Sequence, residues 1–338
     1  MMAEYEDIKP ALRFAGNTME YWQAWRHKMR HALLEVMGMD YSPEKRLATP
    51  FEAEIQEEVD LGHSIRRRIV FQSDPYLSLI TYVFIPKDRK EPGPAVVALH
   101  GHGRGVQDVL GNDEGDQRII DHIRGANYTY PEQMAQHGFV VIAPEQRGWG
   151  ETREPDDVKS GDIWRSSCDY DSAIAYLFGK TIVAERVYDV FRCIDYLSTM
   201  PEVDANRVGC MGLSGGGTVT TYASALDERI KAACISCAFS TFRGSIIATH
   251  HCLCNYQPGI LKYGEQADVT GLIAPRAVLI EAGEKDGVFP VDAVRTAYTQ
   301  LQEIYAAAGA EDKLEIDIFD GGHMFSGKKT FDFFARQL

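Results

Sequence analysis

Arg207-Val208-Gly209-Cys210-Met211-Gly212-Leu213-Ser214-Gly215-Gly216-Gly217-Thr218 is the stretch of sequence that decides the fold. Its apolar first half predicts a buried strand, and the small residues that continue to Leu226 predict a helix packed closely on a sheet. Gly212-x-Ser214-x-Gly216 has the spacing of a nucleophile elbow, a strand-to-helix turn so tight that the serine hydroxyl projects from the sheet edge. The alternative is an ordinary glycine-rich turn, because 30 of the 338 residues are glycine.

The segments on either side of this stretch favour the elbow. Residues 201–206 are rich in turn formers and separate the strand from the helix before it. After the predicted helix, residues 230–239 form the next apolar run and predict another buried strand. Strand, serine, helix and strand follow one another in the order that the motif requires.

Length and composition are those of one large α/β domain with insertions. Hydrophobic residues make up 45% of the chain and charged residues 25%, and no repeat or low-complexity tract interrupts it. The net charge of −14 argues against nucleic acid or an anionic membrane as the main partner. Seven cysteines, an acidic first segment unlike a secretory signal and the lack of a membrane-length apolar run predict a cytoplasmic protein with reduced thiols. The sequence does not fix the oligomeric state, and it is compatible with a homo-oligomer.

The chain divides into an N-terminal helical extension, residues 1–60, and a main domain, residues 61–338. Within the extension, residues 18–38 have the apolar spacing of an amphipathic helix that packs on the main domain. Residues 65–71 and 77–85 predict an antiparallel edge hairpin, and the apolar run at 95–99 predicts a buried parallel strand. Segments near 106–130 and 152–180 have no clear period, and we interpret them as cap-like insertions over the site.

The loop after the strand at 95–99 reads His100-Gly101-His102-Gly103. In a serine hydrolase of this architecture such a loop supplies one backbone N–H to the oxyanion, and the residue after the nucleophile supplies the other. We therefore predict the N–H groups of His102 and Gly215 as the oxyanion hole. Phosphate binding is the alternative for a glycine-rich loop, but no Gly-Lys-Ser/Thr sequence follows.

Several other side chains are candidates for the substrate pocket: His100, Arg147, Trp149, His250 and His251. Arg147 could instead belong to a structural network with Glu145. His250-His251-Cys252-x-Cys254 places four soft ligands within five residues, which raises a metal hypothesis. The spacing is neither CxxC nor HxxxH and no second ligand pair is evident, so the sequence favours a structural or pocket-lining role, with no metal and no cofactor.

The remaining catalytic candidates lie near the C-terminus. Asp286 follows the predicted strand at 276–282, with Glu284 as its competitor, and His323 follows the last predicted strand at 314–319. Ser214, Asp286 and His323 thus come in the order serine, acid, histidine, each just after a strand. Because the carboxyl ends of parallel strands share one edge of the sheet, we expect the three side chains to converge there.

Seven motifs follow one another along the chain: His100-Gly101-His102-Gly103, Glu145-Gln146-Arg147-Gly148-Trp149-Gly150, Arg192-Cys193-Ile194-Asp195-Tyr196-Leu197, the elbow stretch, Ala274-Pro275-Arg276, Gly283-Glu284-Lys285-Asp286 and Gly322-His323. With these motifs the chain resembles α/β-hydrolases of the dienelactone-hydrolase and acetyl-xylan-esterase type, particularly a bacterial esterase-like branch. The resemblance covers roughly residues 65–335 and implies an α/β-hydrolase fold, with a mostly parallel central sheet flanked by helices, and a triad of nucleophile, acid and base at Ser214, Asp286 and His323. Dienelactone hydrolases use a cysteine nucleophile, so the serine here favours ester cleavage.

The sequence therefore predicts a serine hydrolase that cleaves small-molecule carboxylic esters, short acyl esters or acetylated sugars, through an acyl-enzyme intermediate. A small-peptide serine peptidase would share the triad, but such enzymes usually carry a large additional domain. A non-catalytic ligand-binding protein on the same scaffold would normally have lost a triad member, and all three candidates are present.

Overall fold

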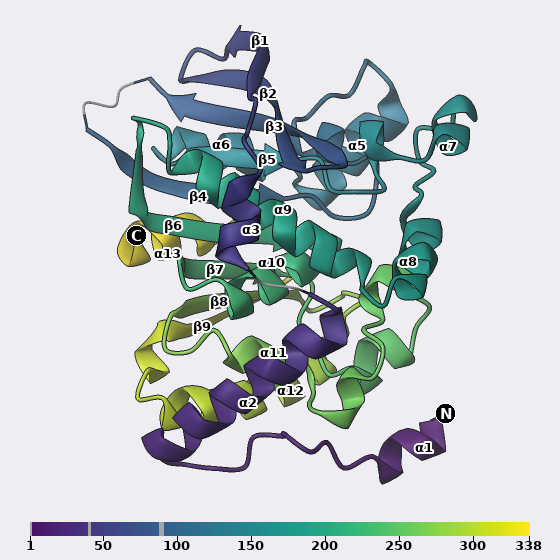
Figure 1. The fold of residues 1–338 in the computed structure, drawn as a ribbon, viewed down its shortest axis with the longest axis vertical. Coiled ribbons are helices and arrows are strands. Elements are labelled where there is room, and N and C mark those ends of the chain that lie inside the picture. Colours follow the sequence, from purple (N-terminus) through teal and green to yellow (C-terminus); the bar gives the residue numbers. More distant parts are fainter. Residues whose placement is uncertain (1, 40–41, 88–90) are drawn as a thin grey trace.

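The computed structural model describes residues 2–39, 42–87 and 91–338. Their strands form one sheet in the order β1-β2-β3-β5-β4-β6-β7-β8-β9. Antiparallel pairing joins β1, β2, β3 and β5, and parallel pairing joins β5 through β4 to β9. The sheet runs through the middle of the molecule with helices on both sides (Figure 1). The strands are β1 (Glu54–Asp60), β2 (Ser64–Asp74), β3 (Leu77–Pro86), β4 (Gly93–Leu99), β5 (Val140–Pro144), β6 (Val203–Leu213), β7 (Ile230–Ser236), β8 (Ala277–Gly283) and β9 (Leu314–Phe319).

The helices follow the alternation expected of an α/β chain. The parallel strands are separated by helical segments, as crossover connections require. The α-helices are α1 (Met2–Asp7), α2 (Met19–Met37), α3 (Pro43–Ala48), α4 (Val106–Val109), α5 (Gln117–Ala126), α6 (Tyr130–Gln136), α7 (Pro155–Lys159), α8 (Cys168–Leu177), α9 (Ile182–Leu197), α10 (Gly215–Leu226), α11 (Gln266–Gly271), α12 (Val291–Ala307) and α13 (Thr330–Gln337).

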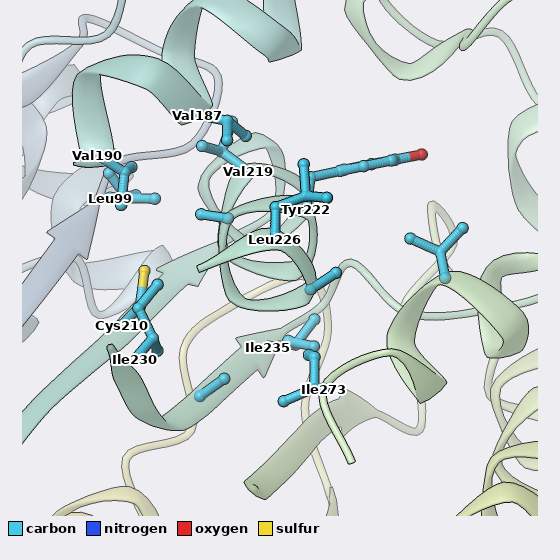
Figure 2. Close-up of a cluster of buried hydrophobic side chains, with 14 of the residues drawn as sticks. Leu99, Val187, Val190, Cys210, Val219, Tyr222, Leu226, Ile230, Ile235 and Ile273 are labelled. Carbon is cyan, nitrogen blue, oxygen red and sulfur yellow. The ribbon is translucent and has the colours of Figure 1, made fainter. Parts of the chain in front are cut away.

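Two hydrophobic cores lie on the two faces of the sheet, because side chains alternate between faces along each strand. In β4, Val97 and Leu99 belong to the core under α2, α9, α10 and α12, whereas Val96 and Ala98 belong to the core under α5, α6 and α13. Figure 2 shows part of the first core, where Val187 of α9 and Val219 of α10 lie over the strands. Both faces of the central strands are therefore buried, which explains their continuous apolar sequences.

The order of the strands reverses at β4. The chain crosses from β4 to β5 on one side, then returns through α9 to β6 on the other side of β4. Loops that leave the carboxyl ends of such neighbouring strands diverge and open a crevice between them, which is the usual place for a ligand in an open α/β sheet. The loop after β4 carries His102 and the turn after β6 carries Ser214. Because Gly215 follows Ser214, both predicted oxyanion donors, His102 and Gly215, lie at this point.

The predicted amphipathic helix is α2, capped by Thr18 at its start and by Gly38 in a left-handed conformation at its end. It lies beside α11 and α12, as predicted (Figure 1). The boundary at residue 60 needs a correction, because residues 54–60 are not helical but form β1, the edge strand outside the predicted hairpin. The strand is exposed and acidic, without the apolar alternation that marks a half-buried strand. Its acids face arginines of β2, with Glu58 opposite Arg67.

Candidate active site

Ser214 occupies the tight turn that the elbow pattern predicts. Its φ of 58° and ψ of −119° place a non-glycine residue in a strained conformation between β6 and α10. The glycines around it permit the close approach, since a Cβ on Gly216 would lie 2.1 Å from the carbonyl oxygen of Leu99 and one on Gly212 would lie 2.4 Å from the carbonyl carbon of Gly216. The turn therefore depends on the absence of side chains at both glycines.

Asp286 and His323 form the acid–histidine pair expected from their order. His323 Nδ1 lies 2.9 Å from Asp286 Oδ2, and the other carboxylate oxygen accepts hydrogen bonds from the N–H groups of Val288 and Phe289. Burial of the carboxyl group opposes its ionisation, but these hydrogen bonds outweigh burial and lower the pKa of Asp286 below its usual value. The competitor Glu284 is exposed. The structure thus pairs His323 with Asp286 rather than with Glu284.

The residue after β7, Cys237, lies between the serine and this pair. Ser214 N donates to the carbonyl oxygen of Ser236, and the Cys237 thiol, the Asp286 carboxylate and the His323 imidazole have polar atoms within 4.8 Å of one another. Within the described residues, no hydrogen bond joins Ser214 Oγ to another protein group. Hydrogen bonds of catalytic groups often tighten only when substrate binds. Ser214, Asp286 and His323 each follow a parallel strand, β6, β8 and β9, so the three candidates lie at one edge of the sheet.

The two predicted oxyanion donors lie next to each other. A Cβ on Gly215 would lie 3.8 Å from His102 N and 2.8 Å from His102 Nδ1. Gly215 begins α10, and the first amides of a helix have no intrahelical acceptor. In the parts of the chain that the structure describes, the His102 amide also lacks a protein acceptor, and Tyr128 Oη holds the carbonyl oxygen of His102 at 3.3 Å. Two backbone donors are thus available beside Ser214.

His100 is a support of this loop rather than a wall of a pocket. It is only 1% exposed, and its ring contacts the Gly101 carbonyl oxygen through Nδ1 and the Gln146 amide through Nε2. The Gln146 side chain returns a hydrogen bond to the His100 carbonyl oxygen. These contacts join the loop after β4 to the loop after β5 and leave no ring nitrogen for substrate.

Trp149 and Arg147 also make structural contacts, whereas the sequence suggests that they line the substrate pocket. Trp149 is 1% exposed, with the His102 ring against its edge and the Arg186 guanidinium 4.0 Å from its ring centre. Arg147 makes ion pairs with Asp74, Glu185 and Asp189. The expected structural network of Arg147 therefore exists, but its partners are these three acids and not Glu145. None of the three adjoins Arg147 in sequence, so local patterns could not identify them.

The neighbouring side chains of His250 and His251 have different environments. His250 is exposed, whereas His251 is 7% exposed and its Nε2 contacts the hydroxyls of Ser245 and Thr249. Burial and the nearby His102 and His323 lower the pKa of His251, which favours the neutral ring. His251 also packs against Phe289, which stacks on His323. Of the two, only His251 reaches the surroundings of the candidate triad.

One group near the site escaped sequence reasoning. Cys168, at the start of α8, lies 3.1 Å from Cys252 between sulfur atoms, and His102 Nε2 lies 3.4 Å from Cys254 Sγ. The four side chains offer one nitrogen and three sulfurs within 4.8 Å of one another. The sequence shows no second ligand pair beside Cys252 and Cys254, which is why it favours a site without a metal. The fold supplies that pair from two distant segments.

Comparison with known proteins identifies relatives of the chain. A family model described as the Abhydrolase family matches residues 1–316. The Bacillus subtilis protein YtaP, named "putative hydrolase", is 27% identical over 250 residues, which is 72% of this chain and 77% of YtaP. Within the described residues, none of the helices combines the length and the apolar character needed to cross a membrane.

Solved structures share the fold at low sequence identity. A "putative acetyl xylan esterase" of Bacteroides fragilis has a TM-score of 0.77 at 17% identity, covering 94% of this chain and 81% of that protein. A glucuronoyl esterase of Solibacter usitatus has a TM-score of 0.69 at 15% identity, covering 98% of this chain and 99% of that one. The predicted α/β-hydrolase fold is confirmed.

Proposed function

The chain belongs to the abhydrolase family, and from this premise we propose that it is a serine hydrolase of carboxylic esters. The single observation that carries the proposal is the strained Ser214 at the turn after β6, at the same edge of the sheet as the bonded Asp286–His323 pair. A serine hydroxyl is a weak nucleophile at neutral pH, so it needs an adjacent base whose orientation a third group fixes.

In the proposed reaction, His323 takes the proton of the Ser214 hydroxyl as the oxygen attacks the ester carbonyl. Asp286 holds the imidazole in the required tautomer and stabilises its charged form. The amides of Gly215 and His102 bind the oxyanion, each such donor contributing about 3 kcal/mol. His323 then protonates the leaving alcohol, and a water molecule activated by the same ring releases the acid and restores the serine.

For the substrate we propose small esters with a short acyl group, acetylated sugars among them. The support is the fold shared with the "putative acetyl xylan esterase" and with a glucuronoyl esterase, together with the order of the triad candidates. A small-peptide peptidase and a non-catalytic binding protein remain alternatives. The cytoplasmic location also stays a prediction.

The proposal is tested with p-nitrophenyl esters from acetate to octanoate, acetylated xylo-oligosaccharides and a methyl ester of a uronic acid. Wild type, Ser214→Ala and the control Ser78→Ala are compared, Ser78 being exposed in β3, outside the site. We expect activity that peaks at acetate, disappears in Ser214→Ala and persists in Ser78→Ala. A fluorophosphonate probe should label wild type and Ser78→Ala alone. Full activity of a folded Ser214→Ala would overturn the assignment, and cleavage of peptides but not esters would favour the peptidase.

A further inference from the structure

Four side chains from three separate segments meet beside the oxyanion loop. His102 comes from the loop after β4, Cys168 from the start of α8 in the second insertion, and Cys252 and Cys254 from the segment at 252–254. We name these four residues the thiol–imidazole cluster. Cys168 and Cys254 are buried, Cys252 and His102 are partly exposed, and none of the three thiols is in a disulfide.

The composition and the spacing of the cluster match a tetrahedral zinc site. Three cysteines and one histidine are a common set of structural zinc ligands, with Zn–S bonds of about 2.3 Å and Zn–N bonds of about 2.0–2.1 Å. Ligand atoms at the corners of such a tetrahedron lie about 3.5–3.8 Å apart. The separation of 3.4 Å from His102 Nε2 to Cys254 Sγ is close to that geometry, the 3.1 Å between the sulfur atoms of Cys168 and Cys252 is shorter than it, and all four atoms lie within 4.8 Å of one another.

The surroundings fit the charge of a loaded site. Zn²⁺ bound to three thiolates and a neutral imidazole carries a net charge of −1, and a cation nearby would compensate it. Arg186 Nη2 lies 3.2 Å from Cys168 Sγ, and Arg186 is 2% exposed. The Asn255 amide, 3.7 Å from Cys254 Sγ, is a second donor to sulfur. Donors of this kind around metal ligands orient them and tune the metal.

We propose that His102, Cys168, Cys252 and Cys254 bind one Zn²⁺ ion that fastens the second insertion and the 252–254 segment to the oxyanion loop. Binding releases the three thiol protons and leaves three Zn–S bonds and one bond to His102 Nε2. The ion has a structural role, because all four positions are filled by protein and none is left for substrate. The small Gly215 makes room for the ring, since a Cβ there would lie 2.8 Å from His102 Nδ1.

The first test is the metal content of the full chain, purified under reducing conditions after expression with added zinc. We expect about one Zn²⁺ per chain, as for structural zinc sites. Cys168→Ser and Cys254→Ser should retain little of it, and the control Cys193→Ser, a buried thiol of α9 outside the cluster, should retain all of it. Wild-type protein without bound zinc, or equal loss in Cys193→Ser, overturns the proposal.

A second test does not depend on the variants folding. Wild-type protein is stripped with a chelator, loaded with Co²⁺ and examined by absorption spectroscopy. A thiolate-to-cobalt charge-transfer band with intense tetrahedral d–d bands is expected, together with protection of Cys252 from iodoacetamide when Zn²⁺ is added. Weak octahedral bands, or a Cys168–Cys252 disulfide found by mass spectrometry in the freshly purified protein, would contradict it. Neither result bears on Ser214, so the failure of this proposal and that of ester hydrolysis are distinguishable.

Discussion

His323 Nδ1 lies 2.9 Å from Asp286 Oδ2, and the second oxygen of this carboxylate accepts hydrogen bonds from the backbone amides of Val288 and Phe289. The carboxylate is therefore fixed from one side by the chain and offers a single oxygen to the imidazole. This arrangement leaves His323 Nε2 as the nitrogen that would face Ser214. It makes the orientation of the ring depend on Asp286.

Asp286→Asn should lower kcat for p-nitrophenyl acetate by about 10⁴-fold, as loss of the acid does in serine triads. The amide can donate to Nδ1 and so stabilise the wrong tautomer, with the proton on Nε2, which cannot accept the proton of Ser214. Initial rates at saturating substrate test this, with Glu284→Gln as the matched control. Glu284 is exposed in the same loop, and its variant should keep wild-type kcat. A large loss in Glu284→Gln would instead make Glu284 the orienting acid.

The same carboxylate predicts a dependence of stability on pH. Its pKa in the folded protein is lowered, because the hydrogen bonds from His323 and the amides outweigh burial. An unfolded aspartate has a pKa of about 3.9, so the group stabilises the fold above that pH and loses this contribution as pH falls through the lower folded pKa. The difference in Tm between wild type and Asp286→Asn should therefore be largest near neutral pH and shrink below about pH 4. A difference that grows on acidification contradicts this sign.

The catalytic candidates were predictable because each depends on local order along the chain. Ser214, Asp286 and His323 each follow an apolar strand, and parallel strands bring their ends to one edge whatever the loops between them do. The elbow adds a steric signature, since its glycines are required by contacts within a few residues or with the adjacent strand. Sequence periodicity is therefore sufficient to place these three candidates at one edge of the sheet.

The rest of the site depends on contacts between segments far apart in the sequence. Cys168 and Cys252 are 84 positions apart, and nothing near either one predicts the other. The partners of Arg147 lie up to 73 positions away, and β1 pairs with β2 through its backbone although its sequence lacks an apolar alternation. Trp149 has the sequence context of a pocket residue, yet it is buried and its ring packs nearly perpendicular to the His102 ring. Such features come from tertiary packing, which a single sequence does not encode in any local period.

Gly216→Ala should destabilise the protein by about 1–3 kcal/mol or more, because the new methyl group would overlap the carbonyl oxygen of Leu99 at 2.1 Å. Gly125→Ala is the matched control, since Gly125 lies in α5 with open space around its Cα and no positive φ. There the exchange should be neutral or stabilising by about 0.5–1 kcal/mol. Thermal unfolding of both variants measures the difference, and equal Tm values would show that the turn is looser than its geometry implies.

Arg147→Met should destabilise the fold without changing the chemistry of the site. Removing the guanidinium leaves Asp189, 3% exposed, without its charge partner, and breaking a buried pair in this way costs about 3–5 kcal/mol. Denaturant unfolding should show that loss, while KM for p-nitrophenyl acetate, measured well below the unfolding transition, should equal the wild-type value. Arg67→Met serves as the control, because its partner Glu58 is 52% exposed and such pairs contribute only about 0–1 kcal/mol. A raised KM with unchanged stability in Arg147→Met would instead indicate that Arg147 lines the substrate pocket.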